Sequence, residues 1–276
     1  MNIIPLLAHQ KLVAGNNGGQ TITDLASYTR QGKFILSAKS DAGTNPTLAV
    51  KLQNSAPLAR LASVTPASTD TTAAVGSRTG ATTNIKLAAK FTLASAASIS
   101  QIYLPLKKTG APTGTLTAAI YADTAGDPSG TALATFSTLD VSTLTTSFAE
   151  TLFSLTSVVD LAAGDYHIVV TSDVSASASV YVSWNSITVT SGGNGNIYNE
   201  AWAADGTINF AFKAFFYQFA DVTGGGFTGV TATASTQMLE INVDKLAVIR
   251  PYVTVGGTNT PAFYVTVSGL VTPVQP

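Results

Sequence analysis

The stretch FILSAKSDAGTNPTLAVKLQ, residues 34–53, decides the fold. From Thr47 to Gln53 it alternates apolar and polar residues with a period of two, which is typical of a half-buried β-strand. Residues 41–46, which contain Gly, Asn and Pro, precede this strand and predict a turn. We therefore expect a β-hairpin here.

A similar stretch, AVIRPYVTVGGTNTPAFYVTV, occupies residues 247–267 near the other end of the chain. Both stretches share a strand, a turn with Gly, Thr, Asn and Pro, and an alternating return strand, so we interpret them as two hairpins of one β-sandwich. Pro251 cannot donate to a central ladder, which places its strand at an edge or at a bulge. Two explanations of the likeness stay open, a true internal repeat and common turn chemistry.

The composition favours many short strands. Charged residues make up 11% of the 276 residues, well below the roughly 25% of an average soluble domain. Thr, Ser, Ala and Gly take their place, and these residues favour strands and turns. Because 45% of the residues are hydrophobic, the chain can bury a core. No segment shows a sustained helical period, so the predicted class is all-β.

Charge and residue usage argue against several functions. The net charge is −1 and no basic block occurs, which disfavours nucleic-acid binding. Without cysteines there are no disulfides or thiolate metal sites, and two histidines far apart in sequence offer little for zinc. The N-terminus has neither a positive region nor a long apolar run, so we expect no signal peptide, no membrane insertion and folding in the cytoplasm.

The middle of the chain differs in character from its ends. Residues 65–83 are small and polar, as expected of a linker or crossover. Strand patterns resume in residues 84–218, separated by Gly, Pro and Ser turns, and predict a self-contained β-sandwich. The predicted organisation is a discontinuous base sandwich, residues 1–64 and 219–276, with residues 84–218 inserted into one of its loops.

The inserted segment resembles a jelly-roll module that is common in phage and bacterial surface proteins and similar in plan to carbohydrate-binding modules. The residues that carry the resemblance are ISQIYLPLKKTGAPTG at 99–114, LTAAIYAD at 116–123, GDPSGT at 126–131 and LAAGDYHIVV at 161–170. The resemblance implies an antiparallel jelly roll and covers about half of the chain.

The flanking segments resemble a small structural protein of the tailed-phage virion. The matching residues are GQTITDL at 19–25, GTNPTLAVKLQNS at 43–55 and DKLAVIRPYVTVGGT at 244–258. The resemblance implies a head decoration protein that docks on the major capsid protein or other virion subunits and projects its insert outward. It also implies a homo-oligomer located in the virion after assembly in the host cytoplasm. The alternative is a tail or fibre component that binds a host-surface glycan or another receptor.

Catalytic patterns are weak, and we expect no enzyme. The sequence lacks the Gly-x-Ser-x-Gly elbow of serine hydrolases. His167 lies in an alternating strand, where an ordinary strand histidine facing solvent or a polar partner explains it, and His9 lies in the N-terminal arm. The acidic residues of the insert fall mostly in turns, where Asp is expected for backbone reasons. Two glycine-rich stretches, residues 192–196 and 224–226, lack the features of phosphate-binding loops and are predicted as plain loops.

An aromatic cluster is the best candidate for a ligand surface. Trp184, Tyr198 and Trp202, together with Tyr181, fall within 22 residues and include both tryptophans of the chain. Aromatic faces stack on sugar rings, so these side chains predict a weak glycan site. The alternative, which we favour for most of them, is packing in the core. Trp202 is the one expected in an exposed loop.

Calcium is the one cofactor that the insert suggests. Jelly-roll modules of this plan often hold a structural ion, and Asp123, Asp127 and Asp165 offer the oxygen ligands that calcium prefers. Their spacing matches no dedicated calcium loop. The alternative is that these aspartates cap turns, and otherwise no cofactor is expected.

The two ends of the chain supply candidate docking segments. The N-terminal arm is apolar at Ile3, Ile4, Leu6 and Leu7 and shows no strand partner of its own in the sequence. We expect it to pair with a neighbouring subunit by strand addition. The same is expected of the C-terminal tail, residues 270–276.

Overall fold

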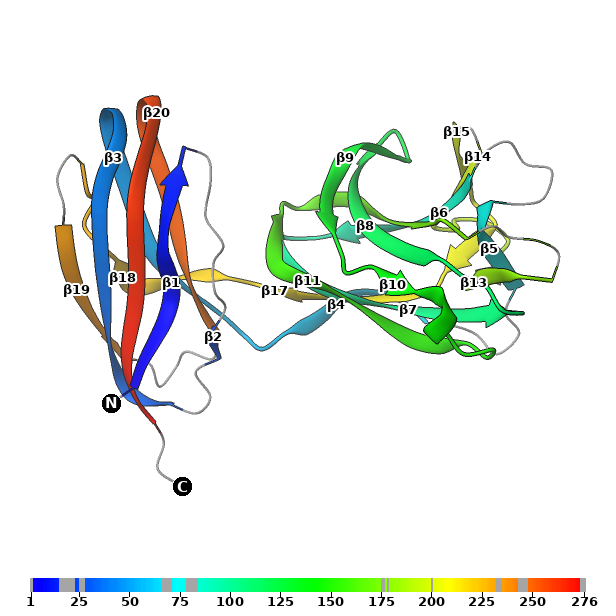
Figure 1. The fold of residues 1–276 in the computed structure, drawn as a ribbon, viewed down its shortest axis with the longest axis horizontal. Helices are drawn as coiled ribbons and strands as arrows, with labels where there is room; N and C mark the ends of the chain where they lie inside the picture. The colour runs from blue at the N-terminus through cyan, green and yellow to red at the C-terminus, as the bar shows by residue number, and fades with distance from the viewer. Residues whose placement is uncertain are drawn as a thin grey trace. The chain divides into compact units, whose positions relative to one another are not determined.

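The computed structural model confirms the all-β class (Figure 1). It describes residues 2–14, 23–24, 28–65, 71–77, 84–174, 177, 179–199, 201–231, 235–242 and 248–273. The chain divides into two compact units: unit 1 comprises Met1–Pro57 and Tyr217–Pro276, and unit 2 comprises Leu58–Phe216. No helix in these ranges has the length and hydrophobicity needed to cross a bilayer.

Unit 1 is organised around two very long strands, β3 (Tyr28–Ser55) and β20 (Val248–Pro273). They pair antiparallel along almost their whole length, from Val248 opposite Ser55 to Pro273 opposite Tyr28. Shorter strands flank this ribbon. They are β1 (Asn2–Val13), β2 (Thr23–Asp24), β18 (Ala220–Gly226) and β19 (Ser235–Asn242).

The pairing corrects the predicted hairpins. In the described ladders neither long strand pairs with itself, and each half of β3 pairs instead with the facing half of β20. Both strands bend at their Gly-Thr-Asn segments, so the ribbon lies on itself as two layers (Figure 1). Strands β1 and β19 flank one half of the ribbon, and β2 and β18 flank the other.

The bends depend on backbone conformations that asparagine tolerates. Asn45 has φ 47° and Asn259 has φ 55°, in the left-handed region where Asn is several-fold enriched among residues other than Gly. The two bends also contact each other. The Asn259 side-chain amide donates to the Thr44 hydroxyl at 3.0 Å, and the Thr258 hydroxyl donates to the Thr44 carbonyl at 3.2 Å.

Folding the ribbon in half buries alternate residues over 34–38 and 48–52 of β3 and over 253–255 and 263–267 of β20. The core of unit 1 draws on the two halves of β3 and of β20 and on β1, and it consists mainly of Leu6, Leu7, Leu12, Phe34, Leu36, Leu48, Val50, Leu52, Val253, Val255, Phe263, Val265 and Val267. The first and last parts of the chain therefore share one hydrophobic interior. Neither part can bury its apolar face without the other.

The order of pairing has an internal symmetry. β1 and β2 both pair with β20, while β18 and β19 both pair with β3. The strands thus form two equivalent sets, β1, β2, β3 and β18, β19, β20. In each set the first two strands pair with the third strand of the other set. This topology favours the internal repeat over common turn chemistry.

Unit 2 is inserted between these two sets, at a point where the chain would otherwise make a short turn. Asn54 on β3 lies opposite Ala220 on β18, so the two connections leave unit 1 side by side. The Ser55 hydroxyl accepts from the Gln218 amide at 3.0 Å and donates to the Ala56 carbonyl at 2.8 Å. Because the ends of the insertion are already adjacent, closing the long loop costs little extra entropy.

Unit 2 contains two facing antiparallel layers. The first layer, here the β12 sheet, runs in the order β9 (Asp127–Thr135), β8 (Thr115–Thr124), β12 (Gly164–Ser172), β6 (Asn84–Leu93), β14 (Gly195–Asn199) and β15 (Ala201–Asp205), with β10 (Leu139–Asp140) also on β8. The second, here the β7 sheet, is formed by β11 (Ala149–Leu161), β7 (Ala97–Thr109), β13 (Tyr181–Thr188), β16 (Ile208–Phe210), β17 (Phe212–Tyr217), β4 (Ala59–Val64) and β5 (Thr71–Ser77). A short 3-10 helix spans Val141–Thr143.

The core of unit 2 lies between these layers. On β12 the residues that enter it are Tyr166, Ile168 and Val170, and alternation sends His167 and Val169 to the opposite side. We call that opposite side the outer face of the β12 sheet. Large aromatic side chains from β17 and the preceding segment, Phe210, Phe212 and Phe216, fill the core from the other layer.

The predicted boundaries need correction at the linker. β4 belongs to unit 2, because Val64 pairs with Phe212 and Ala59 with Phe216. Within the predicted linker, β5 pairs with β13 from Val75 opposite Val182 to Thr71 opposite Ser186, and it also reaches β6. The composition of residues 71–77 suggested a loop. The segment is rich in Thr and Ala and forms a strand because the edge of β13 is available for pairing. The rest of the predicted linker, residues 66–70 and 78–83, lies outside the described residues.

We predict that unit 1 folds without the insertion. Replacing residues 58–216 by a two-residue Asn-Gly turn should give a shortened chain with a cooperative thermal transition and dispersed amide resonances. Phe263→Ala in that chain should lower its free energy of unfolding by about 3–5 kcal/mol, since a fully buried aromatic side chain is removed from the shared core. A shortened chain that shows no cooperative transition would contradict the shared interior.

Candidate functional site

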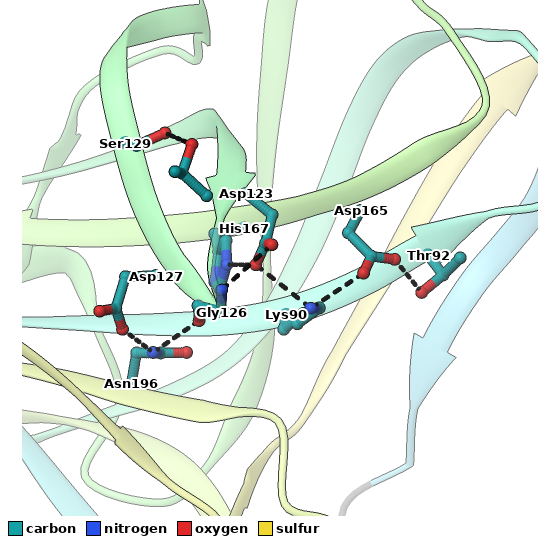
Figure 2. Close-up of polar contacts among 10 residues, drawn as sticks. Lys90, Thr92, Asp123, Gly126, Asp127, Ser129, Asp165, His167 and Asn196 are labelled. Atoms are coloured by element: carbon teal, nitrogen blue, oxygen red, sulfur yellow. Dashed lines mark hydrogen bonds and ion pairs between the residues drawn. The ribbon is translucent and has the colours of Figure 1, made fainter.

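The outer face of the β12 sheet carries a cluster of interacting polar side chains (Figure 2). Register places Lys90 on β6 opposite His167 on β12, and His167 opposite Tyr121 on β8. Asp165 lies two residues before His167 on the same face, and Asp123 lies two residues after Tyr121 on the same face. Three adjacent strands therefore bring these groups together.

Lys90 links the two aspartates of this cluster. Its ammonium group lies 2.9 Å from Asp165 Oδ2 and 3.2 Å from Asp123 Oδ1. His167 Nε2 lies 2.7 Å from the same Asp123 oxygen, and the Thr92 hydroxyl donates to Asp165 at 2.6 Å. Figure 2 shows the resulting chain from Thr92 through Lys90 to His167.

Asn196 on β14 fixes the β8–β9 turn beside this chain. Its side-chain amide donates to the Gly126 carbonyl at 3.0 Å and to Asp127 Oδ1 at 2.9 Å. The turn residues Ala125 and Gly126 both have positive φ, and the Gly126 amide donates to Asp123 Oδ2 at 3.2 Å. The turn is thereby bonded to β14 through Asn196 and to β8 through Asp123.

The environment shifts the pKa values of Asp123, Asp165, Lys90 and His167. Burial alone would raise the pKa of Asp123, but hydrogen bonds from His167, Lys90 and the Gly126 amide outweigh it and lower that pKa. The Thr92 hydroxyl and then Lys90 lower the pKa of Asp165, and Asp165 in turn raises the pKa of Lys90. Burial lowers the pKa of His167, and the hydrogen bond to Asp123 offsets this only in part.

His167 is fully buried, and its neutral form donates through Nε2 to Asp123. Its Nδ1 atom has no hydrogen-bond partner among the described residues. A histidine that acts as a general base in a nucleophilic triad must accept a proton from the nucleophile. No described hydroxyl group contacts Nδ1, and through Nε2 His167 joins β12 to Asp123 on β8.

The predicted calcium ligands do not fit a calcium site. Asp123 and Asp165 do approach each other, but the Lys90 ammonium lies between them and supplies the positive charge that a cation would bring. Asp127 is held by the Asn196 amide instead. Within the described residues no group of three or more His, Asp or Glu side chains is arranged to hold a metal ion.

Trp184 has no surface to offer a sugar, which corrects its assignment to the glycan site. Its side chain is 0% exposed, and its ring stacks on Phe210 with centroids 4.7 Å apart. The indole N–H donates to the Ala211 carbonyl at 2.7 Å, which satisfies the one polar group that burial removes from water. Trp184 is a core residue of unit 2.

Tyr198 and Trp202 lie together on the outer face of the β12 sheet. They face each other across the β14–β15 hairpin, with ring centroids 5.2 Å apart at an interplanar angle of 65°. Both rings are partly exposed, and the Lys86 ammonium lies 4.7 Å from the centroid of the Tyr198 ring. Trp202 is therefore on a strand and not in the predicted loop.

The β14–β15 hairpin was not predicted from the sequence, because its glycines and asparagines suggested a loop. Gly193 is packed so closely that an added Cβ would meet the Ile208 carbonyl oxygen. Asn194 then accepts from the Phe210 amide at 2.7 Å and donates to the Phe210 carbonyl at 3.3 Å. The apparent loop residues thus fasten the hairpin to β16. Likewise, the second predicted glycine loop, residues 224–226, forms the end of β18.

The predicted docking residues divide between core and surface. Leu6 and Leu7 are fully buried in unit 1, and β1 has a partner in β20, so the prediction of an unpaired arm is wrong for these residues. Ile3 is 71% exposed. The side chain of Ile4 lies outside the described residues. The tail from Leu270 to Pro273 is part of β20, and residues 274–276 lie outside the described residues.

Ile3 belongs to an apolar face of unit 1. It lies opposite Leu270, and Met238 on β19 lies opposite Ile35 on β3. Ile35 lies between the core residues Phe34 and Leu36, so it points to the outer side of the sheet β1–β20–β3–β19, and Met238 opposite it does the same. Leu270 lies three residues beyond the core residue Val267 on β20, which puts Leu270, and Ile3 opposite it, on that outer side as well. We call these four residues, Ile3, Ile35, Met238 and Leu270, the Ile3 face.

Comparisons with known proteins add little to this geometry. No protein-family model matches the sequence, and no curated protein sequence matches it. Among solved structures, the cysteine protease and lectin-like domains of Cwp84, a surface-layer-associated protein of Clostridium difficile, are 18% identical with a TM-score of 0.34. That match covers 48% of this chain and 32% of the Cwp84 chain.

Two further matches are to particles of infectious bursal disease virus. The chain of the VP2 subviral particle is 8% identical to this chain, with a TM-score of 0.26. The match covers 97% of this chain and 74% of the VP2 chain. The chain of the T=1 particle is 10% identical to this chain, with a TM-score of 0.28. The match covers 99% of this chain and 72% of the particle's chain. Likenesses at this level carry no argument about function, which must come from the residues themselves.

We predict that acid destabilises unit 2 through His167. Because its pKa in the folded state is below the ordinary 6.5, the unfolded chain takes up the proton first as the pH falls. The free energy of unfolding of unit 2 should therefore decrease below pH 6.5, with a slope of at most about 1.4 kcal/mol per pH unit for one proton. Urea unfolding followed by tryptophan emission measures this, since both tryptophans lie in unit 2.

His167→Asn should remove that slope between pH 7 and pH 5. The loss of stability as the pH falls below the ordinary aspartate pKa of 3.8 should remain in this variant. The reason is that Thr92 and Lys90 still lower the pKa of Asp165 in the folded state. An unchanged slope in the variant would assign the acid sensitivity to other groups.

We also predict that acrylamide distinguishes the two tryptophans. Trp202 is partly exposed and Trp184 is fully buried, so only part of the emission should be quenched. Trp202→Phe should leave a blue-shifted emission that acrylamide hardly affects. Strong quenching in that variant would show that Trp184 is not in the core.

Proposed function

We propose that this protein is a structural component of a virus particle, anchored through unit 1 and displaying unit 2. Within that role we favour a head decoration protein of a tailed phage that docks on the major capsid protein. The observation that carries the proposal is the Ile3 face. It gives unit 1 an apolar surface of the kind that binds another protein.

Exposure supports this choice of surface. Among the described large hydrophobic side chains, Ile3 at 71% and Met238 at 65% are the most exposed, and both belong to unit 1. Lys33 on β3 lies opposite both Leu270 and Glu240, so charged side chains border the apolar ones. Lys33 lies on a central strand of this face, and a mixture of apolar and charged side chains is common at the interfaces of non-obligate complexes.

The way unit 2 is inserted supports separate roles for the two units, docking for unit 1 and display for unit 2. Unit 2 has its own core, and its two connections leave unit 1 from adjacent strands at the place of a single turn. The alternative, a tail or fibre component that binds a host-surface receptor, uses the same two units with unit 2 as the binding part.

Attachment to particles tests the proposal. Particles that lack this protein would be mixed with the full chain or with the chain lacking residues 58–216, and bound protein measured after sedimentation. Both should bind with similar affinity. Ile3→Asp combined with Met238→Asp should weaken binding by at least about tenfold, because a charge would be placed in an apolar contact.

Leu152→Asp is the matched control, since Leu152 is a 45% exposed apolar residue of unit 2. It should leave attachment unchanged. Attachment that requires residues 58–216, or that fails equally in the Leu152 variant, would contradict docking through unit 1. Equal attachment to isolated heads and to tails would exclude the specific role in head decoration.

A further inference from the structure

The aromatic pair on the β14–β15 hairpin is not needed for the core of unit 2. Tyr198 and Trp202 belong to neither hydrophobic core, whereas Ile197, the residue before Tyr198, packs against the core of unit 2. The hairpin is held by Asn194 and by pairing of β14 with β6. Two large rings are thus kept on a sheet surface where small residues would suffice for folding.

The geometry of the pair suits a flat ligand. The two rings meet at 65°, so one face can support a ring-shaped molecule while the other ring forms a side wall. Sugar rings present C–H groups on one side and hydroxyl groups around their edge, and they stack on such aromatic faces. The hairpin itself is fixed, because Asn196, two residues before Tyr198, is bonded to the β8–β9 turn.

Lys86 adds a positive charge at this platform. It lies opposite Tyr198 in the pairing of β6 with β14, and its ammonium is 4.7 Å from the Tyr198 ring centroid. Four residues along the same face, Lys90 is neutralised by Asp123 and Asp165. No ion pair among the described residues involves Lys86. Its charge is therefore available to an anion that stacks beside it.

We propose that Lys86, Tyr198 and Trp202 form a binding site for an acidic sugar residue, such as a hexuronate at the end of a surface glycan. Trp202 and Tyr198 contact the sugar ring, and Lys86 pairs with its carboxylate. The site goes beyond the structural role proposed above and does not depend on it, since it lies within unit 2.

The experiment compares an acidic and a neutral sugar of the same size. Trigalacturonate and galactotriose would be titrated into the full chain, with tryptophan emission as the readout. Trigalacturonate should bind about tenfold more tightly, because its carboxylate pairs with a cation at a partly exposed site. Lys86→Met keeps the apolar stem of the side chain and should reduce trigalacturonate binding to the level of galactotriose.

Two further variants complete the test. Trp202→Ala should abolish binding of both sugars, measured by calorimetry, while the emission of buried Trp184 verifies that unit 2 stays folded. Lys107→Met is the matched control, because Lys107 also lies over a single aromatic ring, Phe148, at 4.6 Å. It should leave both affinities unchanged.

Equal affinity for the two sugars, a preference that survives Lys86→Met, or no binding of either sugar would overturn the proposal. Particle attachment of the Lys86 variant is measured in parallel. Normal attachment together with lost sugar binding would separate the two functions, and failure of attachment alone would leave the sugar site supported.

Discussion

The pairing of β3 with β20 is the constraint on which unit 1 depends. These strands come from opposite ends of the chain, and their ladder runs from Val248 opposite Ser55 to Pro273 opposite Tyr28. Folding this ribbon in half turns two alternating patterns into one closed core. Until both ends of the chain are present, each strand exposes an apolar face and an unpaired edge.

This constraint also explains why a second unit can be carried at little cost. The insertion separates two sets of strands that pair with each other. The β3–β20 ladder and the β3–β18 pairing can therefore form whatever sequence is inserted between the two sets. The pairing of Asn54 with Ala220 and the Ser55 contacts lie at the junction in unit 1. A long-range ladder of this kind has a high contact order, and slow folding is its expected consequence.

In unit 2 the two sides of one sheet have different roles. The inner side of β12 supplies Tyr166, Ile168 and Val170 to the core, while the outer side holds the Lys90, His167 and aspartate network. That network pairs the partly exposed charges of Lys90, Asp123 and Asp165 with one another, and the ammonium group lies where the aspartates suggested a metal ion. The rigid surface that results carries Tyr198 and Trp202 at its edge.

The sequence by itself determined the all-β class, the presence of an interrupted sandwich and most strands of unit 2, because alternation and turn residues act locally. It also marked Ile3, Tyr198 and Trp202 as residues of interest. Partner choice was decided only by tertiary structure. The period of two in residues 34–53 is the same whether the strand pairs with its own return or with β20, so a hairpin was the natural but wrong prediction. For the same reason composition could not reveal β5 or the β14–β15 hairpin, nor that Trp184 is buried while Trp202 is partly exposed, since burial depends on which sheet face each strand presents after pairing.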